Sequence, residues 1–173
     1  MAKEYFVISH WSTLIENFNV APTKFYEQVE MEIRKREIPE IHLATSEMKE
    51  GGIFSTKRLY FTVERKRYCL DICGAPFGTG FFVSSWLSFS LTFLQSILLP
   101  FSVIPILGKI LAPVIGDITL YQQDTTRMFQ QSVHNAVLDV IDGITKTQGL
   151  KALSEGERKP VMSEFYQPKS LRR

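Results

Sequence analysis

The strongest feature in the pattern of hydrophobic and polar positions lies in the middle of the chain. Residues 72–108 contain no Asp, Glu, Lys, Arg or His, and residues 81–107 are mostly large and apolar. A charge-free apolar run of about 18 residues or more is typical of a membrane-spanning helix. A helix over residues 81–99 would extend about 28 Å, close to the ~30 Å thickness of the hydrocarbon core. The pattern therefore predicts a membrane helix over residues 81–99.

Small polar residues recur every four positions in this predicted helix. They are Ser84, Ser88, Thr92 and Ser96. In a bilayer, small hydroxyl side chains let two helices approach closely and hydrogen-bond to each other. We therefore predict that these four residues form a helix-packing surface. The alternative is a buried helix of a soluble core, whose hydroxyls bond to carbonyl groups one turn earlier.

Prolines interrupt the apolar run beyond the predicted helix. Pro100, Pro105 and Pro113 each remove a backbone donor and would kink or end a helix. We interpret residues 100–118 as a return segment, which makes the apolar region a helical hairpin or a re-entrant segment. One long kinked span is the third possible arrangement.

The residues before the apolar run predict a small α+β module. Pro22 suits the first turn of a helix that continues to Glu37. The apolar positions of this helix recur at helical spacing, at Phe25, Val29 and Ile33. Three strand patterns follow, over residues 41–48, 53–64 and 68–73. They predict a three-stranded antiparallel meander with one face covered by the helix.

After the apolar run, residues 124–147 have the spacing of a long amphipathic helix. Three regions follow from these patterns. Residues 1–73 form a cytoplasmic α+β module, residues 74–120 a membrane-embedded segment, and residues 121–173 a helical C-terminal region with a basic tail. The predicted fold class is thus α+β with membrane helices.

Charge modifies this picture in two ways. The net charge of +2 provides no large basic surface for nucleic acid. Arg65, Lys66 and Arg67 immediately precede the apolar run, where basic residues favour the cytoplasmic side and anionic headgroups. Because Lys109 and Arg127 follow the run, we predict a membrane location with both termini in the cytoplasm. A solvated hairpin with ordinary surface charge is the other interpretation of the basic cluster.

No motif in the chain predicts a catalytic, cofactor or metal site. The Gly74–Gly80 loop lacks the third glycine of a dinucleotide-binding loop, because Val83 stands in its place. We interpret the loop as a flexible junction between the sheet and the membrane helix. Cys69 and Cys73 with His42 match no common zinc spacing, so we expect buried, reduced thiols.

Three polar residues of the C-terminal helix carry groups that could take part in catalysis. Asp139 and Asp142 flank its apolar stripe, and His134 has no partner nearby in sequence. We interpret all three as the solvated edge of the helix.

These patterns favour a small integral membrane protein without enzymatic activity. It would act as an assembly or interaction component through the hydroxyl-lined helix and the amphipathic helix. Its partners would be the lipid bilayer and either a second copy or another membrane protein, with no cofactor. The alternative is a soluble ligand-binding protein or enzyme in which residues 81–118 line an apolar pocket.

Overall fold

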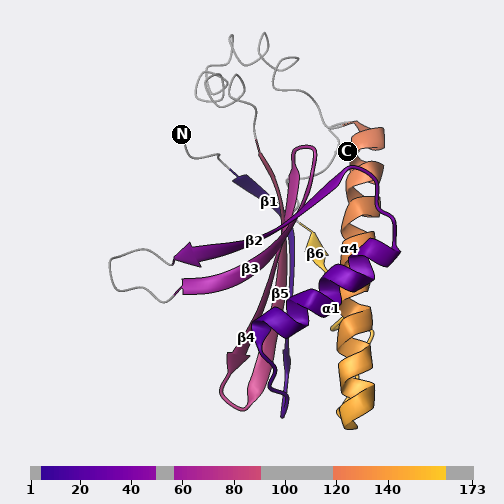
Figure 1. The fold of residues 1–173 in the computed structure, drawn as a ribbon. Helices are drawn as coiled ribbons and strands as arrows, with labels where there is room; N and C mark the ends of the chain where they lie inside the picture. Colours follow the sequence, from indigo (N-terminus) through magenta and orange to yellow (C-terminus); the bar gives the residue numbers. More distant parts are fainter. Residues whose placement is uncertain (1–4, 50–56, 91–118, 163–173) are drawn as a thin grey trace, which may run out of the picture.

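The fold was determined as a computed structural model that describes residues 5–49, 57–90 and 119–162 (Figure 1). Within these ranges, six strands form one antiparallel sheet in the order β2-β3-β4-β5-β1-β6. The elements in chain order are β1 Tyr5–Ile15, α1 Pro22–Lys35, β2 Ile41–Lys49, β3 Lys57–Arg65, β4 Tyr68–Phe77, β5 Gly80–Ser90, α4 Leu120–Gln148 and β6 Val161–Met162.

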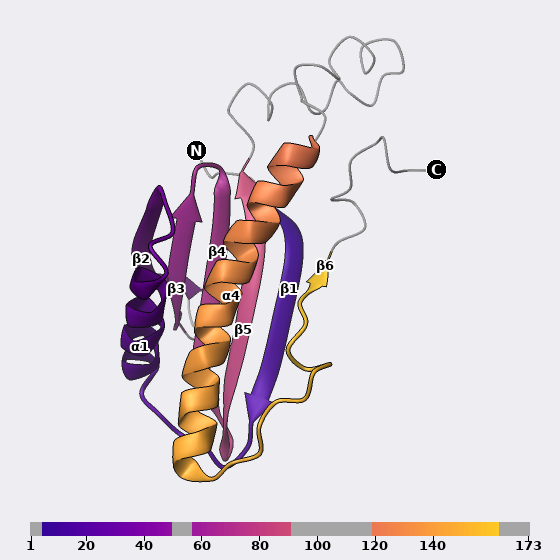
Figure 2. The same ribbon diagram turned by 90° about the vertical axis from the view of Figure 1, so that its right-hand side faces the viewer.

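Both helices pack on the same face of the sheet. Figure 2 shows α1 over the β2 side and α4 running along the strands nearer β5. The core lies between these two layers, and strands β1 to β5 contribute alternate residues to it. Its fully buried members include Phe25, Val29 and Ile33 of α1, Val63, Leu70, Ile72, Phe81 and Val83 of the sheet, and Val133, Val137 and Ile141 of α4.

Helix α1 forms where the sequence predicts a helix. Pro22 stands at its start, where the missing backbone donor costs nothing, and Arg34 and Lys35 in the last turn suit the negative end of the helix dipole. The stripe of Phe25, Val29 and Ile33 is buried against the sheet.

The predicted membrane helix is wrong. Residues 80–90 form β5, a central strand that pairs with β4 on one side and with β1 on the other. Phe81, Val83 and Leu87 point into the core, so the apolar run is explained by burial within the sheet. Among the described residues, no helix is both long enough and apolar enough to cross a membrane.

The classification that rested on this helix fails with it. The described chain is a six-stranded antiparallel sheet with two helices, in place of an α+β module joined to membrane helices. The integral membrane function and the membrane location with cytoplasmic termini are therefore also wrong. Residues 91–118, which contain the remainder of the predicted span and its return segment, lie outside the described residues.

The Gly74–Gly80 segment is also different from the predicted junction. Strand β4 continues through residues 73 and 74 to Phe77, and a tight turn with Gly78 at φ 60° leads into β5. Gly74 is required by close packing, because a Cβ there would lie 2.7 Å from a ring carbon of Phe25. Its backbone N–H donates to the Tyr26 hydroxyl at 2.9 Å, and this hydroxyl donates to the Leu59 carbonyl at 2.6 Å. Burial of this phenol raises the pKa of Tyr26 to about 12.

Strand β1, from the N-terminal part of the chain, lies in the sheet between β5 and β6. It pairs with β5 along its length, with Trp11 opposite Ser85, and has a bulge between Val7 and Ser9. Ile8 and Ser9, the two residues at this irregularity, are both buried. The bulge explains why the N-terminal hydrophobic residues show no clean period in the sequence.

Candidate ligand-binding groove

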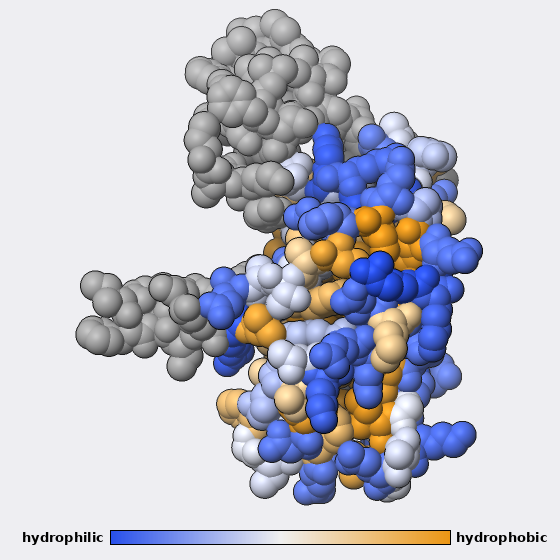
Figure 3. All heavy atoms as spheres, in the orientation of Figure 1, coloured by the Kyte–Doolittle hydropathy of each residue, from blue (hydrophilic) through white to orange (hydrophobic). Residues whose placement is uncertain are grey.

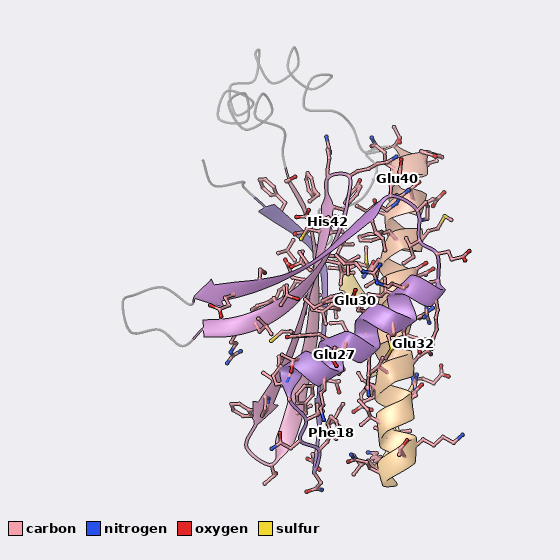
Figure 4. All side chains as sticks on the ribbon, viewed as in Figure 1. Phe18, Glu27, Glu30, Glu32, Glu40 and His42 are labelled. Atoms are coloured by element: carbon pink, nitrogen blue, oxygen red, sulfur yellow. The ribbon has the colours of Figure 1, made fainter. Side chains whose placement is uncertain are left out.

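A groove of about 420 Å³ lies between α1 and the C-terminal half of α4. Its apolar lining comes from the segment before α1 and from α4, and consists of Phe18, Val20, Val140 and Ile144. Polar and flexible side chains surround this lining: Gln28, Met31, Glu32, Asp139, Thr147 and Gln148. Figure 3 shows hydrophobic surface among hydrophilic side chains over the two helices. Phe18 and Glu32 are labelled in Figure 4.

The floor of the groove is fixed to the core of the protein. The Phe18 ring packs edge-to-face on Phe81 of β5, with ring centroids 5.5 Å apart. Phe81 in turn packs against Phe25 of α1 at 5.3 Å. Strand β5 thus supports the groove from below, although none of its residues lines it. Such edge-to-face pairs restrict ring rotation, so the floor is preformed.

Gly143 leaves a gap in the wall of the groove that α4 forms. It lies within the 29-residue α4, and a Cβ placed on it would have no described atom within 4 Å apart from its chain neighbours and the backbone of its own helix. A glycine inside a helix costs about 1 kcal/mol of stability relative to alanine. No close packing in the described structure requires this glycine, and its missing side chain leaves space between the helices. Sequence reasoning missed this residue, although a lone glycine within a helical pattern is the signal that could have found it.

Two basic side chains, Arg36 and Lys35, pair with the two carboxylates at the rim of the groove. The Arg36 guanidinium lies 2.5 Å from an Asp139 carboxylate oxygen and 3.7 Å from a Glu32 carboxylate oxygen. Lys35 also pairs with Glu32, at 2.5 Å. Arg36 therefore links the end of α1 to α4 beside the groove. Because its carboxylates are paired with basic side chains, the rim has little net charge. Because these groups are partly exposed, the pairs stabilise the fold only weakly, by about 0–1 kcal/mol each.

The groove is suited to binding an apolar group. Among the described residues that line it there is neither His nor Cys, and both of its carboxylates are paired with basic side chains. Elsewhere in the part of the chain that the structure describes, no group of three or more His, Cys, Asp or Glu side chains could hold a metal ion. The arrangement can bind an apolar group and orient it with neutral hydrogen-bonding side chains.

Two of the four predicted helix-packing residues lie on β5. Ser84 and Ser88 are buried on the sheet face opposite the helices, and the Ser88 hydroxyl donates to the Cys69 carbonyl at 3.4 Å. Thr92 and Ser96 lie outside the described residues. A packing role for the four residues as a set therefore stays a prediction.

The predicted headgroup-facing residues lie at the turn between β3 and β4. Arg65 and Lys66 pair with the Glu40 carboxylate at 3.6 and 3.0 Å, and Arg65 also donates to the Pro39 carbonyl. Arg67 is exposed. These bonds connect the turn to the segment before β2. Contact of the three residues with lipid headgroups stays a prediction.

The comparisons with known proteins give no family for this fold. No protein-family model, no curated protein and no solved structure matches the chain.

Proposed function

We propose that this protein binds an apolar small molecule in the groove between α1 and α4. The observation that carries the proposal is Gly143, which keeps a preformed apolar floor accessible at a cost in helix stability. The groove volume of about 420 Å³ falls within the range of roughly 300–1,000 Å³ that is usual for small-molecule sites.

The lining indicates the chemistry of the ligand. Val20 and Ile144 are only half-buried, so a ligand that covers them removes apolar surface from water. Gln28, Thr147 and Gln148 offer neutral donors and acceptors at the edge. Since Arg36 already pairs with both carboxylates of the rim, the groove favours an uncharged ligand with an apolar body and a small polar end.

The test fills the groove at Gly143. N-phenyl-1-naphthylamine, a neutral probe that fluoresces in apolar sites, should bind the unaltered protein. Gly143→Leu places a branched side chain in the groove and should weaken probe binding by about tenfold or more, which corresponds to about 1.4 kcal/mol. Gly143→Ala is the matched control, because it raises helix propensity while adding a single methyl group.

Thermal unfolding of the unaltered protein, Gly143→Leu and Gly143→Ala checks that weaker probe binding is not caused by loss of the fold. Both substitutions should preserve or increase the melting temperature, because nothing lies near the added Cβ. Equal probe affinity for Gly143→Leu and the unaltered protein would contradict the proposal, as would an absence of probe binding to the unaltered protein.

A further inference from the structure

The face of the sheet opposite α1 and α4 carries a second group of side chains. The strand register places Thr62 of β3, Asp71 of β4, Trp86 of β5 and His10 of β1 in one row across this face. Neither of the two described helices covers it, because both lie on the other side (Figures 1 and 2). The row is therefore separate from the groove between the helices.

Trp86 is the exposed aromatic residue of this row. Its relative exposure is 41%, and the His10 ring stacks on it with centroids 5.1 Å apart and planes 21° from parallel. This stacking fixes the orientation of the indole. Because Trp86 stands between His10 and Asp71 in the row, the indole face opposite His10 lies on the side of the strand that carries Asp71. The faces of an indole ring carry the negative part of its quadrupole and attract cations.

Asp71 is directly opposite Trp86 on the neighbouring strand, and directly opposite residues have Cβ atoms about 4.5–5.5 Å apart. Its carboxylate accepts a hydrogen bond from the Thr62 hydroxyl at 2.6 Å. Each of its two oxygens is also 3.6 Å from the Cys69 sulfur. No described Lys, Arg or His forms an ion pair with it. The other acid on this face, Glu64, already lies 4.0 Å from His42. Asp71 is thus an oriented carboxylate with acceptor capacity left over.

From this juxtaposition we propose that Asp71 and Trp86 bind an organic cation, an ammonium or guanidinium group, on the sheet face opposite α1 and α4. The carboxylate supplies the opposite charge and the indole supplies a polarised apolar surface, which is the combination that such cations require. A Ca²⁺ or Mg²⁺ ion does not suit the site, because it needs about six oxygen ligands and one carboxylate dominates here. The cation belongs either to a small quaternary ammonium compound or to a Lys or Arg side chain of a peptide.

Titrations followed by nuclear magnetic resonance test the proposal. The indole N–H signal of Trp86 should move saturably on addition of N-acetyl-arginine amide or tetramethylammonium. Trp11, the other tryptophan, is buried and its indole donates to the Glu157 carbonyl, so its signal should stay in place. N-acetyl-citrulline amide, the neutral counterpart of the arginine probe, should bind at least about fivefold more weakly than arginine amide, as expected for a partly exposed charge interaction. Stronger binding of tetramethylammonium than of arginine amide would identify a quaternary ammonium ligand, and the reverse order would identify a peptide side chain.

Two substitutions locate the binding in the row. Asp71→Asn keeps the shape of the side chain and one oxygen that can accept from Thr62, but removes the charge, and should weaken cation binding about fivefold. Trp86→Leu, followed through the Asp71 amide signal, should weaken it by a similar factor. Phe77→Leu removes an aromatic ring that is 68% exposed at the end of β4 and should leave binding unchanged. Equal binding of the arginine and citrulline probes, or unchanged affinity in Asp71→Asn, would overturn the proposal without affecting the groove.

Discussion

At the scale of single residues, His134 shows how burial changes the role of a side chain. Its ring is buried between α4 and β1, edge-to-face with Trp11 at 4.9 Å. One ring nitrogen, Nε2, is 2.7 Å from the Arg158 carbonyl oxygen, while Nδ1 is buried and has no hydrogen-bond partner among the described residues. Burial lowers the pKa of His134, and the bond to Arg158 opposes that shift only in part. The interpretation of His134 as a solvated residue is therefore wrong.

This environment predicts that the protein loses stability on acidification. Below the ordinary pKa of about 6.5, the unfolded chain protonates this imidazole while the folded protein resists protonation. The free energy of unfolding should therefore fall as pH falls below about 6.5, by at most about 1.4 kcal/mol per pH unit from this group. Urea unfolding of the unaltered protein and of His134→Gln at pH 7.5 and 5.5 measures the difference.

The loss between the two pH values should be smaller in His134→Gln than in the unaltered protein. His42→Gln, which alters an imidazole with 74% of its side chain exposed, controls for the loss of a surface histidine. The same pH dependence in His134→Gln and the unaltered protein would show that His134 does not carry the effect.

At the scale of elements, the ends of α4 are defined by local hydrogen bonds. The Thr119 hydroxyl accepts from the Gln122 backbone N–H, and the Gln122 side chain accepts from the Thr119 backbone N–H, both at 3.2 Å. At the other end Gly149 adopts the left-handed conformation, and its N–H bonds to the Lys146 and Thr145 carbonyls. These caps satisfy backbone groups that a helix leaves unpaired.

Loss of the N-terminal cap should weaken α4 measurably. Thr119→Ala removes the acceptor for the Gln122 N–H and should lower the free energy of unfolding by about 1 kcal/mol. Thr119→Ser keeps a hydroxyl in the same place and should stay close to the unaltered protein. Urea unfolding measures both variants, and equal stability of the alanine and serine variants would exclude a stabilising cap at this position.

At the scale of the whole molecule, β5 connects parts of the chain that are far apart in sequence. It pairs with β1 from the N-terminus and with β4, and Phe81 at its start packs between Phe18 and Phe25. The groove floor, the first helix and the sheet therefore depend on the same side chain. This role is incompatible with a helix in a membrane over these residues.

Shortening Phe81 should destabilise the whole fold. Phe81 is fully buried, and Phe81→Ala should lower the free energy of unfolding by about 3–5 kcal/mol, through lost transfer energy and the cavity that remains. Phe77→Ala changes a phenylalanine of the neighbouring strand that is mostly exposed, and should have an effect of about 0.5 kcal/mol or less. Equal stability of these two variants would contradict the assigned position of β5.

The sequence by itself determined the elements in which apolar residues recur with one clear period, either that of a helix or that of a strand. The apolar stripe of α1 at four-residue spacing, the alternation of β3 and β4, and most of α4 are all present in the structure, although β4 continues four residues beyond its predicted end. In each of these elements one face is polar and the other apolar, so the period is visible in the residues themselves. The caps extend α4 to Leu120, four residues before its predicted start.

Only the tertiary structure showed that residues 80–90 form a strand and that Gly143 lines a groove between the helices. Ser84 and Ser88 are four residues apart, a spacing that fits both a helical turn and two periods of a strand, and no charge marks a solvent face. What selects the strand is pairing with β1, more than sixty residues away, which local sequence cannot encode. The groove likewise requires α1 to lie beside α4, so its floor and its open wall come from separate segments that meet only in the folded chain.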